Sequence, residues 1–114
     1  MDRITQFRQA ILSVIEDYIA EQTKQTSLNE VQYQPIIDNE HHRYQLLTVG
    51  WHNRQRIHSL IFHMDIINDK IWIQNDNLEY SVAERLVDRG ISKKDIVLAY
   101  FSPSHRAFTE YATA

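Results

Sequence analysis

The chain of 114 residues is long enough for one domain with a buried core and too short for two, so we expect a single domain over residues 1–114. It has no cysteine, which excludes disulfides and thiolate metal sites, and its net charge of −3 lacks the basic excess typical of nucleic-acid-binding proteins. No apolar run approaches the ~20 residues of a membrane span and the N-terminus has no signal-peptide pattern, so we expect a cytoplasmic protein that does not contact membranes.

The first predicted element is an amphipathic helix that begins after Asp2, whose carboxylate can accept hydrogen bonds from the free amides of the first turn. Apolar residues follow at spacings of three and four, which is the period of one helix face. They are Ile4, Phe7, Ile11, Val14, Ile15 and Tyr18. We expect this stripe to pack on the protein's own sheet, with a partner-binding helix as the alternative. The polar stretch 21–29 predicts the end of the helix and a connector.

Four strands are predicted next, because the apolar residues change to an alternating pattern. The predicted strands are 31–38, 43–49, 56–67 and 70–74. Pro35 has no amide hydrogen to donate to a sheet, so the first strand is either broken or at an edge. Residues 52–55 close one hairpin. Asn68-Asp69 closes the next, since both residues tolerate positive φ.

The remainder predicts a helix, a fifth strand and a short final helix. Ser81 and Glu84 form a capping box, and Gly90 followed by Ile91 is a typical helix end. The apolar run 96–101 predicts a buried strand, and Ser102-Pro103 predicts a helix start. The fold class is therefore α+β: an N-terminal helix, a four-stranded mostly antiparallel meander, a helix, a fifth strand and a short C-terminal helix, with the helices on one face of the sheet. The sheet edge that the last strand joins is left open.

The hairpin at Asn68-Asp69 places a set of polar side chains and a tryptophan on one face. Counting back from the turn pairs Asp65 with Trp72 and His63 with Gln74. One face then carries only apolar side chains: Phe62, Met64, Ile66, Ile71 and Ile73. The other face carries His63, Asp65, Trp72 and Gln74, while His58 is expected on the apolar face as a neutral, hydrogen-bonded side chain.

Catalysis and metal binding are weakly supported at this face. His63 and Asp65 lie about 7 Å apart along a strand, which is long for a direct hydrogen bond. A metal site needs three or four converging donors, and only two are obvious. The sequence has no nucleophile with an evident partner and only two glycines, so a phosphate-binding loop is not expected. We assign no catalytic residue, metal or cofactor, and keep a small enzyme using His63 and Asp65 as the weakest alternative.

Trp72 is the residue that favours an interaction surface. A tryptophan on the open face of a sheet, surrounded by His63, Asp65 and Gln74, is typical of an aromatic anchor with a polar rim. The predicted partner is another chain, including a copy of the protein itself. In the alternative interpretation, the indole lies flat over neighbouring side chains.

Residues 41–64 contain no acidic residue, although the chain as a whole is acidic. They include Arg43, Arg54, Arg56 and five histidines. We favour a solvated turn in a strand-rich segment as the explanation, and an anion or nucleic-acid contact or a partner-protein patch are the alternatives. We expect Arg106, in the last predicted helix, to be a surface or capping residue, and pairing with an anion or a carboxylate is the alternative.

Several motifs resemble the XisI family, the fdxN element excision controlling factor proteins. They are Gly50-Trp51, Arg56-x-His58, His63-x-Asp65-Ile66, Lys70-Ile71-Trp72-Ile73-Gln74-x-Asp76, Asp95-Ile96-Val97-Leu98, Pro103 and Arg106. The chain departs from the family at two turns, with Asn68-Asp69-Lys70 in place of Asp-Gly-Lys and Leu78-Glu79 in place of Thr-Glu. The resemblance implies a small cyanobacterial α+β protein that controls the excision of a DNA element during differentiation and is not the recombinase. It also implies a partner, the nuclease-like protein XisH.

The preferred hypothesis is a non-enzymatic accessory or regulatory factor that acts through protein–protein contacts. It would form a homo-oligomer, a dimer or larger, and bind a XisH-like protein through Trp72, His63, Asp65 and Gln74. Its contact with nucleic acid would be indirect. The alternative is a direct DNA-binding factor that uses Arg43, Arg54 and Arg56.

Overall fold

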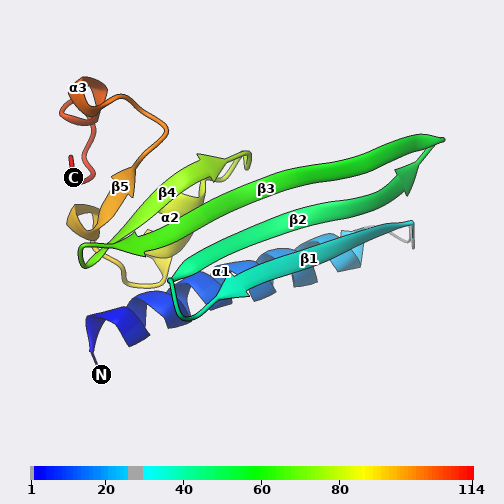
Figure 1. Cartoon of the computed structure of the whole chain (residues 1–114), viewed down its shortest axis with the longest axis horizontal. Coiled ribbons are helices and arrows are strands. Elements are labelled where there is room, and N and C mark those ends of the chain that lie inside the picture. The colour runs from blue at the N-terminus through cyan, green and yellow to red at the C-terminus, as the bar shows by residue number, and fades with distance from the viewer. Residues whose placement is uncertain (1, 26–29) are drawn as a thin grey trace.

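The computed structural model describes residues 2–25 and 30–114 and has an α+β fold, with an N-terminal helix, a five-stranded mixed sheet and two further short helices (Figure 1). The elements in chain order are α1 (Arg3–Gln25), β1 (Val31–Asp38), β2 (Arg43–His52), β3 (Gln55–Ile67), β4 (Lys70–Asp76), α2 (Val82–Asp88), the 3-10 turn η1 (Lys93–Asp95), β5 (Ile96–Leu98) and α3 (Pro103–Arg106). This confirms the predicted fold class. No helix among the described residues is long and apolar enough to cross a bilayer.

Helix α1 forms for the predicted reasons and ends within the predicted stretch. The Thr5 amide donates to Asp2 Oδ1 over 2.7 Å, which caps the first turn. The predicted apolar stripe is buried or partly buried in the core. The helix ends at Gln25, within the stretch 21–29 that was predicted to contain its end. Residues 21–25 contain glutamate, glutamine and lysine, which favour helix even without an apolar period. The rest of the predicted connector, residues 26–29, lies outside the described residues.

The sheet has the order β1-β2-β3-β4-β5, and only the β4–β5 pair is parallel. Strand β1 lies at the edge, as Pro35 predicted. Strand β5 joins the sheet beside β4, after the chain has crossed through α2. The C-terminal segment then continues past the outer side of β5, where the Ala112 amide donates to the Ile96 carbonyl over 2.8 Å.

Two tight hairpins define the meander. Asn53 and Arg54 have φ of 49° and 67°, and Asn68 and Asp69 have φ of 50° and 63°. These left-handed pairs match the twist of the strands they join. Strands β2 and β3 reach His52 and Gln55, so the predicted end of the second strand at residue 49 is too early.

One face of the sheet packs against α1 and α2 to form the core. The fully buried sheet side chains include Tyr44, Leu46, Phe62, Met64, Ile71 and Ile73. They belong to one cluster with the α1 stripe and with Leu86 of α2. Because each buried aliphatic side chain contributes about 1.5–3 kcal/mol, a one-residue slip of the hairpin would be costly.

Irregular pairing between β2 and β3 moves His58 away from the apolar face. Leu46 pairs with Phe62 but Leu47 pairs with Leu60, so Ile61 is an extra residue in β3. The alternation of side chains therefore changes by one residue at this point. His58 is exposed, and its predicted place on the apolar face is wrong.

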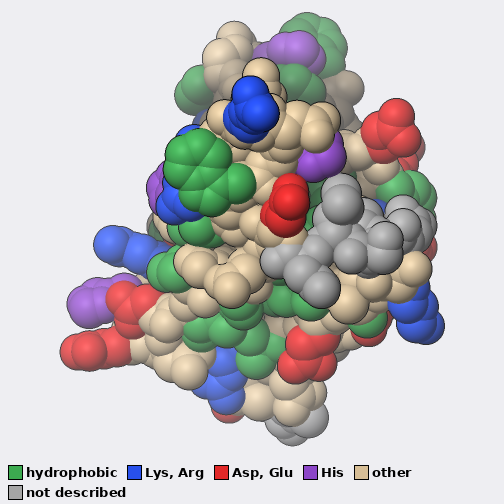
Figure 2. Space-filling view, turned by 90° about the vertical axis from the view of Figure 1, so that its right-hand side faces the viewer, with side chains coloured by type: hydrophobic (Ala, Val, Ile, Leu, Met, Phe, Trp, Pro, Cys, Tyr) green, Lys and Arg blue, Asp and Glu red, His purple; other side chains and the backbone are tan. Residues whose placement is uncertain are grey.

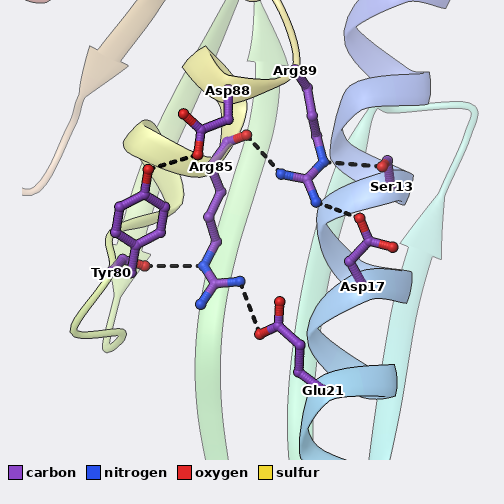
Figure 3. A network of polar contacts seen from close by, with 7 residues as sticks. All are labelled: Ser13, Asp17, Glu21, Tyr80, Arg85, Asp88 and Arg89. Atoms are coloured by element: carbon purple, nitrogen blue, oxygen red, sulfur yellow. Dashed lines mark hydrogen bonds and ion pairs between the residues drawn. The ribbon is translucent and has the colours of Figure 1, made fainter.

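Helix α2 begins and ends as predicted and is joined to α1 by two arginines. Ser81 Oγ accepts from the Glu84 amide over 3.2 Å, and the Ile91 amide closes the far end on the Leu86 carbonyl over 3.1 Å. Figure 3 shows the contacts between the two helices. Arg89 donates to Ser13 Oγ and Asp17, at 3.0 and 2.5 Å, and Arg85 pairs with Glu21 at 3.4 Å. These bonds hold α2 against α1.

Strand β5 is shorter than the apolar run 96–101 predicted. It ends at Leu98, because the Phe101 amide turns back onto the Leu98 carbonyl over 3.2 Å. Tyr100 is 45% exposed, and the Phe101 ring instead stacks on His105 with centroids 4.3 Å apart. The predicted helix start is confirmed, since Ser102 Oγ caps the His105 amide.

Candidate functional site: a polar sheet face

The side chains of His63, Asp65, Trp72 and Gln74, which we call the polar face, alternate with core residues on β3 and β4. Asp65 pairs with Trp72, between the core pairs Met64–Ile73 and Ile66–Ile71, as counting from the turn predicted. Since neighbouring residues of a strand point to opposite sides, these polar side chains lie on the side of the sheet away from α1.

The structure brings His63, Asp65 and Gln74 into direct contact. His63 Nε2 lies 2.8 Å from Asp65 Oδ1, and Gln74 Nε2 donates to Asp65 Oδ2 over 3.2 Å. The His63 and Asp65 side chains are only 23% and 13% exposed. The expectation that these two are too far apart for a hydrogen bond is wrong, because the spacing of about 7 Å applies to the Cα atoms and both side chains can lean along the strand.

A second irregularity changes the predicted pairing beyond Met64. His63 pairs with Asn75 rather than with Gln74, which is the extra residue of β4. The predicted pair is therefore wrong, although Gln74 still reaches Asp65 from the same side. A bulge of this kind re-aims a side chain without ending the ladder.

Trp72 is half-buried and covered by a residue of the last helix. The Arg106 guanidinium lies 5.4 Å from the centroid of the indole ring. Arg106 is itself held by the carbonyls of Leu98 and Ala99, at 3.3 and 3.0 Å. The indole Nε1 is buried and has no hydrogen-bond partner in residues 2–25 and 30–114. Arg106 thus stacks on an aromatic ring, a contact that the sequence did not predict.

The three arginines of the acid-free segment do not form one cluster. Arg43 opens β2 and lies opposite Asp65, whereas Arg54 is in the turn at the other end of the β2–β3 hairpin. Along a strand, these positions are about 30 Å apart. Arg56 lies beside Trp51, with its guanidinium 5.5 Å from the ring centroid.

Trp51 and Phe108 are surface aromatic residues to which the sequence assigned no site. They are 54% and 89% exposed, and Trp51 is the more exposed of the two tryptophans. The position of Trp51 next to Gly50 and a polar turn was the available signal. Because the second strand was predicted to end before Trp51, this residue was assigned to a turn. In the structure it belongs to a strand of a projecting hairpin.

Two shallow hollows lie beside α2, away from the polar face. The larger, of about 390 Å³, is lined by Tyr80, Glu84, Asp88, Lys93 and Tyr111, among others. Its polar groups bind one another: Tyr80 donates to Asp88 over 2.6 Å, which raises the pKa of Tyr80. No group of three or more histidine or carboxylate side chains in the described part of the chain could hold a metal ion.

A family model described as XisI protein matches residues 1–113. Among solved structures, the chain is similar to a XisI-like protein from Anabaena variabilis ATCC 29413, with 32% identity and a TM-score of 0.86 over 97% of this chain and 99% of that chain. It is also similar to the fdxN element excision controlling factor XisI from Anabaena variabilis ATCC 29413, with 32% identity and a TM-score of 0.79 over 99% of this chain and 100% of that chain. No similar sequence is found among the curated proteins.

Proposed function

The chain belongs to the XisI family, and we propose that it is a non-enzymatic accessory factor that helps to control the excision of a DNA element through protein–protein contacts. The proposed contacts are with a XisH-like, nuclease-related protein and with further copies of the chain. One solved relative is named an excision controlling factor, and neither it nor the family carries the name of an enzyme.

The observation that carries this proposal is the ordered array on the polar face. Asp65 accepts from His63 and Gln74 with different oxygens, and Arg106 holds the Trp72 ring. Side chains fixed in this way lose little conformational entropy when a partner binds. A tryptophan and an arginine at the centre of a polar surface are also the residue types that dominate binding energy at protein interfaces.

We expect Trp72→Ala to weaken binding of a XisH-like protein at least ten-fold and to shift the chain to smaller oligomers, because truncation of a central anchor removes most of its contact. Titration calorimetry with the partner and light scattering after gel filtration measure these effects. Phe108→Ala, which removes an exposed aromatic ring that is not one of the four polar-face side chains, is the matched control.

Trp72 is half-buried, so a second variant separates binding from folding. Gln45→Arg places a cation on the same side of the sheet, opposite His63, at a position that is not in the core. It should also weaken both contacts. If both variants fold and still bind the partner and self-associate like the unmodified protein, the polar face is not the interaction surface.

A further inference from the structure

The tip of the β2–β3 hairpin carries an aromatic and basic surface that the proposed function does not use. We propose that this tip binds single-stranded nucleic acid, with Trp51 stacked on an unpaired base and with Arg54 and Arg56 on the neighbouring phosphates. This inference is independent of the polar face and would give the protein a direct contact with nucleic acid in addition to its protein partners.

The fold itself does not require a tryptophan at the tip. Residues 47–60 form the end of the hairpin, and none of them is buried. Figure 1 shows this hairpin reaching the end of the molecule opposite to β5 and α3. A large aromatic ring here contributes little to the core, so its side chain is available for contacts with a ligand.

The local geometry positions Trp51 for stacking. Trp51 and Arg56 are directly opposed across the two strands, and the guanidinium lies 5.5 Å from the ring centroid. Arg56 is also anchored to the Gly50 carbonyl over 3.3 Å. The indole still keeps 54% of its surface exposed. A held aromatic ring beside a cation is the element that proteins use to stack on bases without reading their sequence.

The charge around Trp51 also favours a nucleic acid. No acidic residue occurs between His41 and Met64, and Arg54 lies in the turn with Arg56 two residues after it. Figure 2 faces this end of the molecule and shows hydrophobic, basic and histidine side chains beside one another, with an acidic side chain among them. Glu30 is exposed and its carbonyl accepts from the Trp51 amide over 3.1 Å, so its carboxylate partly offsets the positive charge. The expected contribution of phosphate contacts is therefore small.

The neighbours of Trp51 in the turn suit base stacking. The five residues that follow it, 52–56, are all polar, and two of them are arginines. Stacking on a base needs an exposed ring face and a nearby cation, and the tip supplies both. A base in a duplex is already stacked, so we assign the site to a single strand.

Binding can be measured by the fluorescence anisotropy of a labelled oligothymidylate of about 20 nucleotides at low salt. We expect Trp51→Ala to weaken binding roughly ten-fold or more, and Trp51→Phe to restore part of the loss. Replacing Arg54 and Arg56 with alanine should reduce the slope of log K against log salt by about 1.4, from two lost phosphate contacts. Arg43→Ala, at the other end of β2, and Phe108→Ala should bind like the unmodified protein.

The proposal is overturned if the protein does not bind the oligonucleotide at low salt, or if Trp51→Ala binds it as tightly as the unmodified protein. It is also overturned if only duplex DNA binds, or if Trp51→Ala loses the XisH-like partner while its oligonucleotide binding is unchanged. Trp72 and Gln45 lie outside the tip. The oligonucleotide-binding experiment therefore tests this proposal even if the polar-face variants show that the proposed function is wrong.

Discussion

Gly50 of β2 lies opposite Val31, the first residue of β1. The backbone of β1 leaves no room there for a side chain on residue 50. A Cβ atom here would overlap the Glu30 carbonyl oxygen and the Val31 Cα atom, and φ is 156°. The Glu30 carbonyl is the acceptor for the Trp51 amide. The absence of a side chain at this position therefore lets the edge strand pair with the base of the hairpin tip.

We expect Gly50→Ala to lower the free energy of unfolding by roughly 1–3 kcal/mol, because both steric overlap and backbone strain are introduced. Gly90→Ala is the control, since Gly90 has a φ of 92° but nothing within 4 Å of an added Cβ. It carries the strain without the overlap and should cost less. Urea titration of both variants measures the difference, and an equal or smaller loss at residue 50 would show that the start of β1 moves aside.

Single residues of the site were predicted from local counting, and their contacts were not. The pair Asp65–Trp72 follows from a two-residue turn and an apolar face, both of which are local in sequence. The cover over Trp72 comes from Arg106, which is 34 positions away and reaches the ring only after the chain has passed α2 and β5. Alternation along a strand does not contain that information.

At the scale of elements, the predictions were accurate for helix starts and turns and poor for strand ends. Ser81, Ser102 and the Asn68-Asp69 turn act through bonds or backbone angles within a few residues. The irregular pairings between Leu46 and Leu47 and between His63 and Met64 depend on which side chains meet across strands. The apolar run 96–101 became a strand of three residues because the chain turns onto α3 there, so apolar character alone misjudged its length.

The C-terminal segment along β5 should be most stable between acidic and strongly basic pH. Lys93 Nζ lies 2.6 Å from Glu110 Oε2, and this bond lowers the pKa of Glu110 and raises the pKa of Lys93. The contribution from Glu110 is full above its ordinary pKa of 4.5 and is lost as the pH falls through its lower folded value. The contribution from Lys93 is full below 10.5 and is lost as the pH rises through its higher folded value.

Hydrogen exchange of the Ala112 amide, corrected for the intrinsic effect of pH, measures this dependence. Protection of this amide should decrease when the pH is lowered below the ordinary pKa of glutamate. Glu110→Gln should remove this decrease. Both charges are exposed, so added salt should reduce the effect. Protection that is the same in both proteins at every pH would mean that the backbone bond to Ile96 alone holds the segment.

The whole molecule divides into a packed region and a projecting hairpin. Buried side chains come from α1, α2, β5 and the parts of β2, β3 and β4 nearest to them. The order and type of the elements followed from the sequence because apolar residues recur at helical spacing in the core helices and at alternate positions in the strands of the meander. The projection was missed because the second strand was ended at residue 49, three residues before it stops.

We expect a variant in which Asn-Gly replaces residues 49–58 to fold cooperatively. Thr48 and Ser59 are directly opposed, so a two-residue turn joins them in register. None of the ten removed residues is buried, but Val31 and Gln32 lose their strand partners. The midpoint of thermal unfolding should therefore fall by only about 10 °C or less. The variant should also lose oligonucleotide binding, and a broad, non-cooperative melt would instead show that the tip supports the core.

Each margin of the sheet has a feature that hinders the addition of a strand. On one side, Pro35 removes an amide from β1, and a proline there interrupts any ladder that an incoming chain would build. On the other side, residues near Ala112 already occupy the hydrogen-bonding edge of β5. Edge-to-edge polymerisation of copies of this chain into fibres is thus hindered at both margins. In a crowded solution, two short stretches of the protein's own backbone work against that form of aggregation.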